Sequence, residues 1–152
     1  MPSIGSWITI GHPVVAEIMS AAGFDWLTID LEHSAMGIER AEELIRIIDL
    51  SGVKPFVRLS SNNSVQIKRV MDSGAHGIIV TMIKTAEEAR KAVRAVHYPP
   101  LGDRSVGLAR AQKYGVGFEN YFDWQRDSAM VIVQIEHIEA VNNIQEIFSV
   151  EG

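Results

Sequence analysis

Three ionisable residues, Asp30, Glu32 and His33, lie close together in the segment TIDLEHSA at positions 28–35. They come at the end of an apolar stretch of the kind that forms a buried strand. An aspartate that accepts a hydrogen bond from an imidazole orients the ring and raises its basicity, which suits acid–base chemistry near neutral pH. The spacing equally allows Asp30 to cap the following turn while His33 stays in solvent, and allows Glu32 to be a site residue or a loop charge.

Two further charged residues stand near the ends of apolar runs, Arg58 in PFVRL and Glu136 in VIVQIE. Arginine is rarely buried without a partner, so Arg58 is expected to hold a substrate carboxylate or enolate oxygen, or to pair with Asp30 or Glu136. The carboxylate of Glu136 suits Mg²⁺ or Mn²⁺, with a structural ion pair as the alternative. Gln134 shares its side of an extended strand with Glu136, and a buried hydrogen bond is its alternative role.

The other histidines and one further arginine carry weaker signals. His76 lies in a turn before an apolar run, His97 lies in a Pro-rich loop, and His137 begins a helical segment, so we expect ordinary structural roles for them. His12 follows the first apolar run and could reach the same edge of a sheet as the residues above. Arg104 lies in the Gly-flanked segment GDRSVG, which fits an anion site or a subunit contact but is specific for neither.

Short β-rich runs alternate with segments of helical period along the chain. The runs predict strands at about 4–10, 25–31, 54–59, 77–83 and 130–136. The helical segments predict helices at about 13–22, 38–50, 64–71, 85–96 and 117–128, and one more after 137. Thr85 and Glu88 have the spacing of a capping box at the start of one of these helices. This alternation predicts βα units and a parallel sheet covered on both faces.

Two architectures fit the alternation: an open doubly wound sheet and a (β/α)8 TIM barrel. The barrel is favoured because the sequence has neither GxGxxG after its first strand nor a Walker A loop. A complete barrel takes about 250 residues, and this chain has 152. We therefore predict a single α/β domain, residues 1–152, that covers about the first five βα units of a barrel. The carboxyl ends of barrel strands form the mouth of the active site. The residues expected at this mouth are Gly11, His12, Asp30, Glu32, His33, Arg58, Thr81, Gln134, Glu136 and His137.

The composition is that of an ordinary globular protein, with 47% hydrophobic and 22% charged residues. A net charge of −5 without a basic cluster argues against nucleic acid as a partner. No apolar run approaches the roughly 20 residues of a membrane helix, and the N-terminus lacks a signal-peptide pattern. The absence of cysteine excludes disulfides and thiolate metal sites. We therefore expect a cytoplasmic protein that binds neither membranes nor nucleic acids.

The segments GFDWLTIDLEHS, KPFVRLSSNNSVQIKRVMDSGAHGIIV and VIVQIEHIEAVNNI together resemble the HpcH/HpaI aldolase family over nearly the whole chain. Because that family consists of class II pyruvate aldolases on a TIM barrel, the resemblance implies metal-dependent cleavage of a 4-hydroxy-2-oxo acid to pyruvate and an aldehyde. It also implies Mg²⁺, Mn²⁺ or Co²⁺ as the cofactor and a homo-oligomer, such as a hexamer. The alternatives are another 2-oxo acid lyase or decarboxylase on the same barrel, or a truncated fragment without activity.

The resemblance also implies roles for residues of the second and third strands. The D-x-E-H pattern of the family falls on Asp30, Glu32 and His33. There the Asp–His pair would move the proton of the substrate hydroxyl. The arginine of the third strand falls on Arg58, which would hold the oxygens of pyruvate and stabilise the enolate.

The family pattern V-Q-I-E falls on Gln134 and Glu136, and it implies that Glu136 binds the metal ion while Gln134 contacts substrate. The family carries a second metal-binding aspartate in a segment after the next strand, so the resemblance places that ligand beyond Gly152. No lysine Schiff base is required for this chemistry. In agreement, Lys54 opens its predicted strand and Lys84 precedes a predicted helix, so neither is expected at the mouth.

Overall fold

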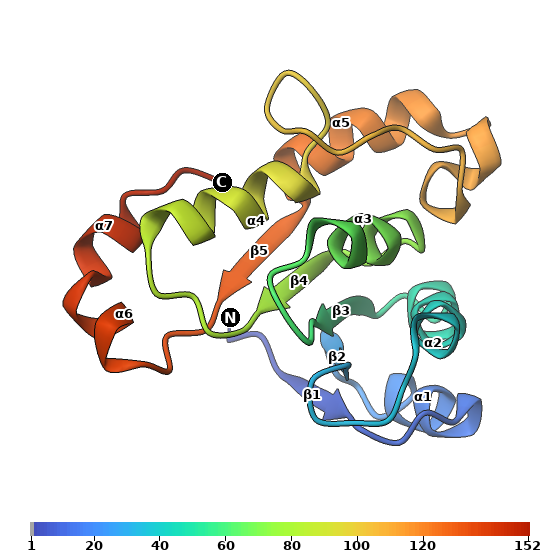
Figure 1. The fold of residues 1–152 in the computed structure, drawn as a ribbon. Helices are drawn as coiled ribbons and strands as arrows, with labels where there is room; N and C mark the ends of the chain where they lie inside the picture. Colours follow the sequence, from blue (N-terminus) through green and yellow to red (C-terminus); the bar gives the residue numbers. More distant parts are fainter. Residues whose placement is uncertain (1) are drawn as a thin grey trace.

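A computed structural model describes residues 2–152, in which the strands form one sheet in the order β1-β2-β3-β4-β5 (Figure 1). The strands are β1 Gly5–Ile8, β2 Trp26–Asp30, β3 Lys54–Arg58, β4 Gly77–Val80 and β5 Met130–Val133. Each strand pairs in parallel with the next one along the chain. This sequential order confirms the predicted α/β class of TIM-barrel type, because a doubly wound sheet reverses its strand order.

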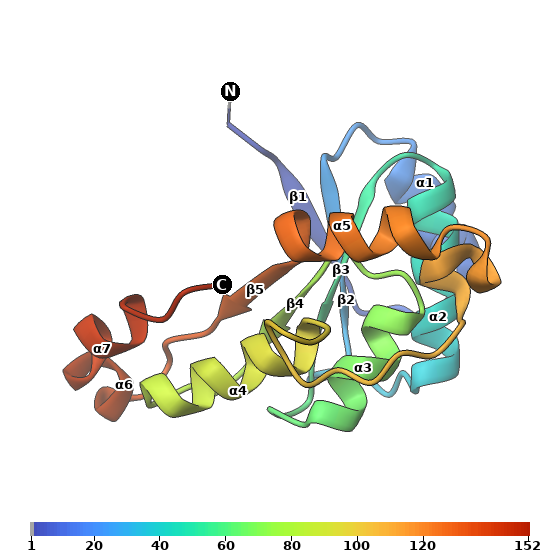
Figure 2. The same ribbon diagram turned by 90° about the horizontal axis from the view of Figure 1, so that it is seen from above.

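Helices connect the strands and cover one side of the sheet. They are α1 Pro13–Ser20, α2 Ile38–Leu50, α3 Ser64–Asp72, α4 Ala86–Val96, the 3-10 helix η1 Arg110–Gly115, α5 Phe118–Ser128, α6 Ile138–Asn142 and α7 Ile144–Phe148. Seen from above, α2, α3 and α4 are spread around the strands, whereas α6 and α7 lie beyond the tip of β5 (Figure 2). None of the helices within residues 2–152 is both long and apolar enough to cross a membrane.

The two faces of the sheet differ in burial. The face against the helices is buried and carries Ile8, Leu27, Ile29, Val57, Ile78 and Val80. On the other face, Trp7 and Met130 remain 42% and 49% exposed. The strand register aligns Trp7, Thr28 and Met130 on this second face, and Asp30 lies on it two residues after Thr28. The partly exposed face corresponds to the interior of a barrel, and it carries the predicted site residues.

The predicted capping box forms at the start of α4. Thr85 Oγ1 accepts a hydrogen bond from the Glu88 amide at 3.2 Å, and Glu88 Oε2 accepts one from the Thr85 amide at 3.2 Å. Two otherwise unpaired amides at the helix terminus are therefore satisfied. This fixes the point at which the chain turns from the carboxyl end of β4 into α4.

The structure departs from several of the predicted elements; β5, for example, ends at Val133 and not at 136. The helix predicted after 137 is divided into α6 and α7, because Asn143 has a non-helical ψ of 12°. The helix η1 occupies a stretch to which the periodicity assigned no element. The strand predicted to reach 83 ends at Val80, because Met82 adopts a left-handed backbone with a φ of 54°.

An ion-pair cluster lies near the amino end of β4, opposite the predicted mouth. Asp49 Oδ2 accepts a hydrogen bond from Arg110 Nη2 at 2.7 Å, and Asp49 Oδ1 lies 3.3 Å from His76 Nε2. The ring of Trp124 packs on His76 with 5.0 Å between centroids. The hydrogen bond with His76, aided by Arg110, lowers the pKa of Asp49 by more than burial raises it. The cluster gives His76 the structural role that we expected.

We expect Asp49→Asn to flatten the acid dependence of stability. Because the folded pKa of Asp49 lies below its ordinary 3.8, the group stabilises the fold above that pH and this contribution is lost as pH falls through the folded pKa. Between about pH 5 and about pH 3, wild type should therefore lose more free energy of unfolding than the variant. Urea unfolding at both pH values measures the difference, and equal losses would contradict the assignment.

Candidate functional site

Asp30 and Arg58 form a bidentate ion pair at the carboxyl ends of β2 and β3. The two residues are register partners. Arg58 Nε donates to Asp30 Oδ1 at 2.9 Å, and Nη2 donates to Oδ2 at 2.6 Å. Asp30 is 1% exposed and the Arg58 side chain is 16% exposed. Of the two ion pairs that the sequence allowed for Arg58, the structure therefore shows the pair with Asp30.

The electrostatics of this pair follow from its burial and its hydrogen bonds. Burial raises the pKa of Asp30, but the hydrogen bonds from Arg58 and from the amides of His33 and Glu32 outweigh it, so that the pKa is lowered overall. The hydrogen bond to Asp30 raises the pKa of Arg58 against the effect of burial. Both groups are therefore charged at neutral pH.

The side-chain pair expected between Asp30 and His33 does not form. Asp30 Oδ1 instead accepts hydrogen bonds from the backbone amides of Glu32 at 3.0 Å and His33 at 3.2 Å. With Arg58 on both of its oxygens, the carboxylate is occupied, and the His33 side chain turns outward to 71% exposure. The expected side-chain contact between Asp30 and His33 is therefore wrong. Asp30 instead caps the following turn, which the spacing also allowed. Asp30 positions His33 through the backbone of the turn.

Glu32 lies between the imidazole and the guanidinium. Its Oε2 is 3.4 Å from Arg58 Nη1 and 3.6 Å from His33 Nε2, yet this buried oxygen accepts no hydrogen bond within the described chain. A buried carboxylate oxygen without a hydrogen bond is costly and is common where a ligand completes the contact. Glu32 therefore lies in one charged cluster with Arg58 and His33.

Arg58 also contacts Trp7, a residue that the sequence gave no reason to select. The guanidinium carbon lies 4.7 Å from the centroid of the Trp7 ring, within the range of a cation–π contact. The Nε and Nη2 edge of Arg58 is taken by Asp30, so a substrate oxygen has to approach the remaining N–H groups on Nη1 and Nη2. The expected clamp on a substrate carboxylate stays a prediction, and it would use the end of the guanidinium.

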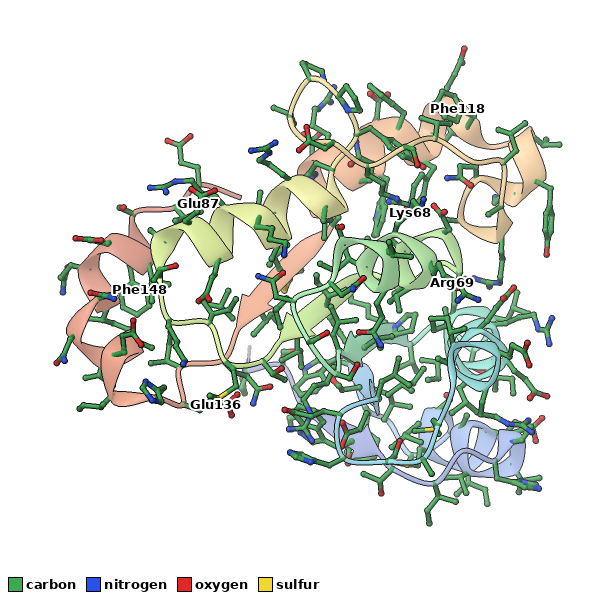
Figure 3. The ribbon with its side chains drawn as sticks, in the orientation of Figure 1. Lys68, Arg69, Glu87, Phe118, Glu136 and Phe148 are labelled. Atoms are coloured by element: carbon green, nitrogen blue, oxygen red, sulfur yellow. The ribbon has the colours of Figure 1, made fainter. Side chains whose placement is uncertain are left out.

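Gln134 and Glu136 follow β5 and lie near the end of β4. The backbone amide of Gln134 donates to the Val80 carbonyl at 2.9 Å, while the side-chain Oε1 of Gln134 is buried without a partner in the described chain. Glu136 Oε1 accepts a hydrogen bond from the Met82 amide at 2.8 Å. Figure 3 shows Glu136 in the turn between β5 and α6, well apart from Lys68 and Arg69 of α3. The hydrogen bond with Asp30 is the main cause that raises the pKa of Arg58, and the charge of Glu136 is the last of the contributions that raise it.

The oxygen donors fit a hard divalent cation in kind but form an incomplete set. The carboxylate of Glu136 and the unpartnered amide oxygen of Gln134 are ligands that Mg²⁺ or Mn²⁺ accepts. Within residues 2–152, however, no three His, Cys, Asp or Glu side chains gather as a metal site. Glu136 and Gln134 are thus the oxygen donors at this end of the sheet, and a metal role for Glu136 stays a prediction.

The remaining candidates lie outside this cluster. His12 and His137 act as helix caps, accepting hydrogen bonds through Nδ1 from the amides of Val14 and Glu139. His97 is buried, and its Nδ1 lies 3.2 Å from Gln125 Oε1. No contact of Thr81 with the cluster is recorded among the described residues, although it is buried after β4. His12 and His137 thus cap helices, and His97 makes a buried contact with Gln125.

Arg104 does not serve the anion or subunit contact that its loop allowed. Its side chain is 0% exposed, and Nη2 donates to Asp72 at 2.6 Å while Nη1 donates to the Tyr121 hydroxyl at 2.9 Å. The guanidinium also lies 4.7 Å from the ring centroid of Tyr98. Arg104 therefore fastens the loop after α4 to α3 and α5.

Comparison with known proteins agrees with this geometry. The profile of the HpcH/HpaI aldolase/citrate lyase family matches residues 3–152. A 4-hydroxy-2-oxo-heptane-1,7-dioate aldolase from Escherichia coli is 41% identical over 153 residues, which are 99% of this chain and 58% of that protein. The chain thus spans a little under three fifths of the length of that curated relative.

Solved structures show the same architecture. An HpcH/HpaI aldolase from Desulfitobacterium hafniense superimposes with a TM-score of 0.90 at 30% identity, covering 98% of this chain and 59% of that one. A family member from Burkholderia cenocepacia gives a TM-score of 0.88 at 29% identity, covering 95% of this chain and 59% of that one. The profile match, the sequence relative and both structures agree, and the chain belongs to the HpcH/HpaI aldolase/citrate lyase family.

Proposed function

We propose that the protein is a carbon–carbon lyase that cleaves a 4-hydroxy-2-oxo acid to pyruvate, or a similar 2-oxo acid, and an aldehyde. The observation that carries the proposal is the charged cluster of Asp30, Arg58 and Glu32 at the carboxyl ends of β2 and β3. The name of the relative, 4-hydroxy-2-oxo-heptane-1,7-dioate aldolase, supports this reaction class and suggests that dicarboxylic substrate as the first to test.

The residues of the chain account for the proton and charge movements of such a cleavage. His33 takes the proton from the C4 hydroxyl as the C3–C4 bond breaks, and the aldehyde forms at C4. The electron pair of the broken bond becomes the enolate of pyruvate, whose oxygen is stabilised by the remaining N–H groups of Arg58. A proton from solvent then reaches C3 and gives pyruvate, while His33 returns its proton to solvent. Asp30 keeps both residues in place, through the guanidinium of Arg58 and the amide of His33.

We further propose that the reaction uses a divalent cation, Mg²⁺, Mn²⁺ or Co²⁺. When bound, the cation would act as a Lewis acid that stabilises negative charge on the 2-oxo acid. Glu136 would hold it, and Gln134 would contribute its unpartnered amide oxygen to substrate or cation. The oxygen chemistry of these donors supports the choice of a hard cation.

His33→Asn is expected to lower kcat by about 10²–10⁴-fold, the usual contribution of a general acid–base residue. Its side chain is 71% exposed, so the melting temperature should change little. Steady-state kinetics and thermal unfolding measure the two effects. A variant with the kcat of wild type would show that His33 does not move the proton.

Pyruvate release from 4-hydroxy-2-oxo acids, coupled to lactate dehydrogenase, tests the proposed function. The protein expressed from its complete gene should release pyruvate with Mn²⁺ or Mg²⁺ and stop when EDTA is added. Activity that survives chelation would overturn the metal dependence. Release of carbon dioxide in place of an aldehyde would favour the alternative, a decarboxylase on the same barrel. A folded protein without any turnover would favour a non-catalytic chain.

We also propose that the protein acts in the cytoplasm as a homo-oligomer on small-molecule substrates. The lack of cysteine is compatible with a reducing compartment. Large apolar side chains on the surface, among them Val116 at 93% exposure and Phe148 at 70%, support an association of chains. Light scattering at several concentrations measures the oligomeric state.

A further inference from the structure

The backbone of Met82 is strained at the carboxyl end of β4. Its φ is 54°, and within residues 2–152 only Lys113 and Tyr114 share a positive φ without being glycine. Residues that have a Cβ rarely adopt this left-handed backbone conformation. Single residues that do adopt it are often found at functional sites. Lys113 and Tyr114 lie in η1, whereas Met82 lies in the turn from β4 to α4.

The strained conformation directs one amide across the end of the sheet. The N–H of Met82 donates to Glu136 Oε1 at 2.8 Å, joining residues that are 54 positions apart. It is the only hydrogen bond recorded to the Glu136 carboxylate within the described chain, so Oε2 has no such partner there. An exposed glutamate is thereby tied by one oxygen to the neighbouring strand.

Contacts on both sides of Met82 hold the turn in place. Thr81 and Ile83 are buried, while Met82 between them is 45% exposed. The Lys84 amide donates to Glu88 Oε2 at 2.7 Å, and the Lys84 carbonyl accepts from Asn143 Nδ2 at 3.0 Å. Strained backbone persists where its surroundings over-determine it, and these contacts have that effect.

We propose that Met82 is a positioning residue whose left-handed backbone aims its amide at Glu136 Oε1 and leaves Oε2 free to bind a cation. The inference rests on the proposed function, because the hydrogen bond from Met82 matters only if Glu136 binds a metal ion. Partners that orient a metal ligand typically contribute about 10–100-fold to metal affinity. The backbone conformation, and not the methionine side chain, carries the effect.

A matched pair of substitutions separates backbone from side chain. Asparagine and valine are similar in size, but asparagine tolerates a positive φ and β-branched valine does not. We expect Met82→Asn and Met82→Gly to bind Mn²⁺ within about threefold of wild type, and Met82→Val to bind about 10–100-fold more weakly. Titration of the protein from its complete gene, with free Mn²⁺ followed by electron paramagnetic resonance, measures these affinities without substrate.

Tyr114→Val controls for strain elsewhere. Tyr114 has a φ of 57° and is 70% exposed in η1, so its substitution should disturb the backbone but leave Mn²⁺ affinity unchanged. If Met82→Val does not fold, Met82→Ala replaces it, because its Cβ without branching should give an intermediate loss of affinity. Equal affinities for the Asn and Val variants would overturn the inference. A wild-type protein that binds no Mn²⁺ would overturn the proposed metal role itself, which distinguishes the two failures.

Discussion

Replacing Arg58 with alanine is expected to lower kcat/KM by at least about 10²–10³-fold, the loss found when a donor to a developing oxyanion is removed. The same change should destabilise the fold by about 3 kcal/mol, because it leaves the buried Asp30 carboxylate without its ionic partner. Steady-state pyruvate release and urea unfolding measure the two losses. Together they would show that one guanidinium serves both catalysis and the architecture of the mouth.

Two comparisons separate these roles of Arg58. Arg58→Lys keeps a positive charge but loses the planar fork that binds both oxygens of Asp30, so it should recover part of the stability and little of the activity. Arg90→Ala removes an exposed arginine that pairs with Glu87 at 3.3 Å on α4, and it should change stability by no more than about 0.5 kcal/mol. An Arg58→Ala variant with wild-type turnover would contradict the proposed mechanism.

Glu136→Gln is expected to weaken Mn²⁺ binding by more than about 100-fold, because it removes the carboxylate that this chain offers to the cation. Turnover at a fixed Mn²⁺ concentration should fall with it. Stability should change by less than about 0.5 kcal/mol, since the side chain is exposed and the amide oxygen still accepts the Met82 hydrogen bond. Calorimetric titration and thermal unfolding measure these effects.

Glu139→Gln is the matched control for this substitution. Glu139 lies three residues later, is 53% exposed, and its Oε2 lies 4.0 Å from Lys84 Nζ. The variant should therefore keep the Mn²⁺ affinity and activity of wild type. If Glu139→Gln and Glu136→Gln lose affinity equally, the effect comes from net charge and the ligand role of Glu136 is wrong.

The order of elements was predictable because each carries a local pattern. The apolar run before Asp30 and the capping box at Thr85 need no tertiary information to be read. The division of the last helix at Asn143 and the formation of η1 were not predictable, because they depend on packing against distant parts of the chain. The end of β4 was predicted too far along the chain because a methionine gives no sequence signal for the left-handed turn at Met82.

The membership of the site was more predictable than its contacts. Parallel strands bring their carboxyl ends together, so Asp30 and Arg58 could be expected side by side from the strand order alone. Which hydrogen bonds Asp30 makes was open, because a carboxylate can orient an imidazole or bind a guanidinium. The partly buried Arg58 decided between them, since a charge removed from water needs the stronger bidentate partner. The direction of the His33 side chain followed from that choice.

Exchange of the methyl protons of pyruvate with deuterated solvent tests the central claim most directly. An enzyme that stabilises the enolate of pyruvate should exchange these protons without any aldehyde, so the measurement does not depend on knowing the second substrate. In proton NMR, the methyl signal should decay with protein and Mn²⁺, and it should persist with EDTA or in Arg58→Ala. Exchange no faster than in buffer, by a folded protein that has bound Mn²⁺, would contradict the assignment of the mouth as a site for enolate chemistry.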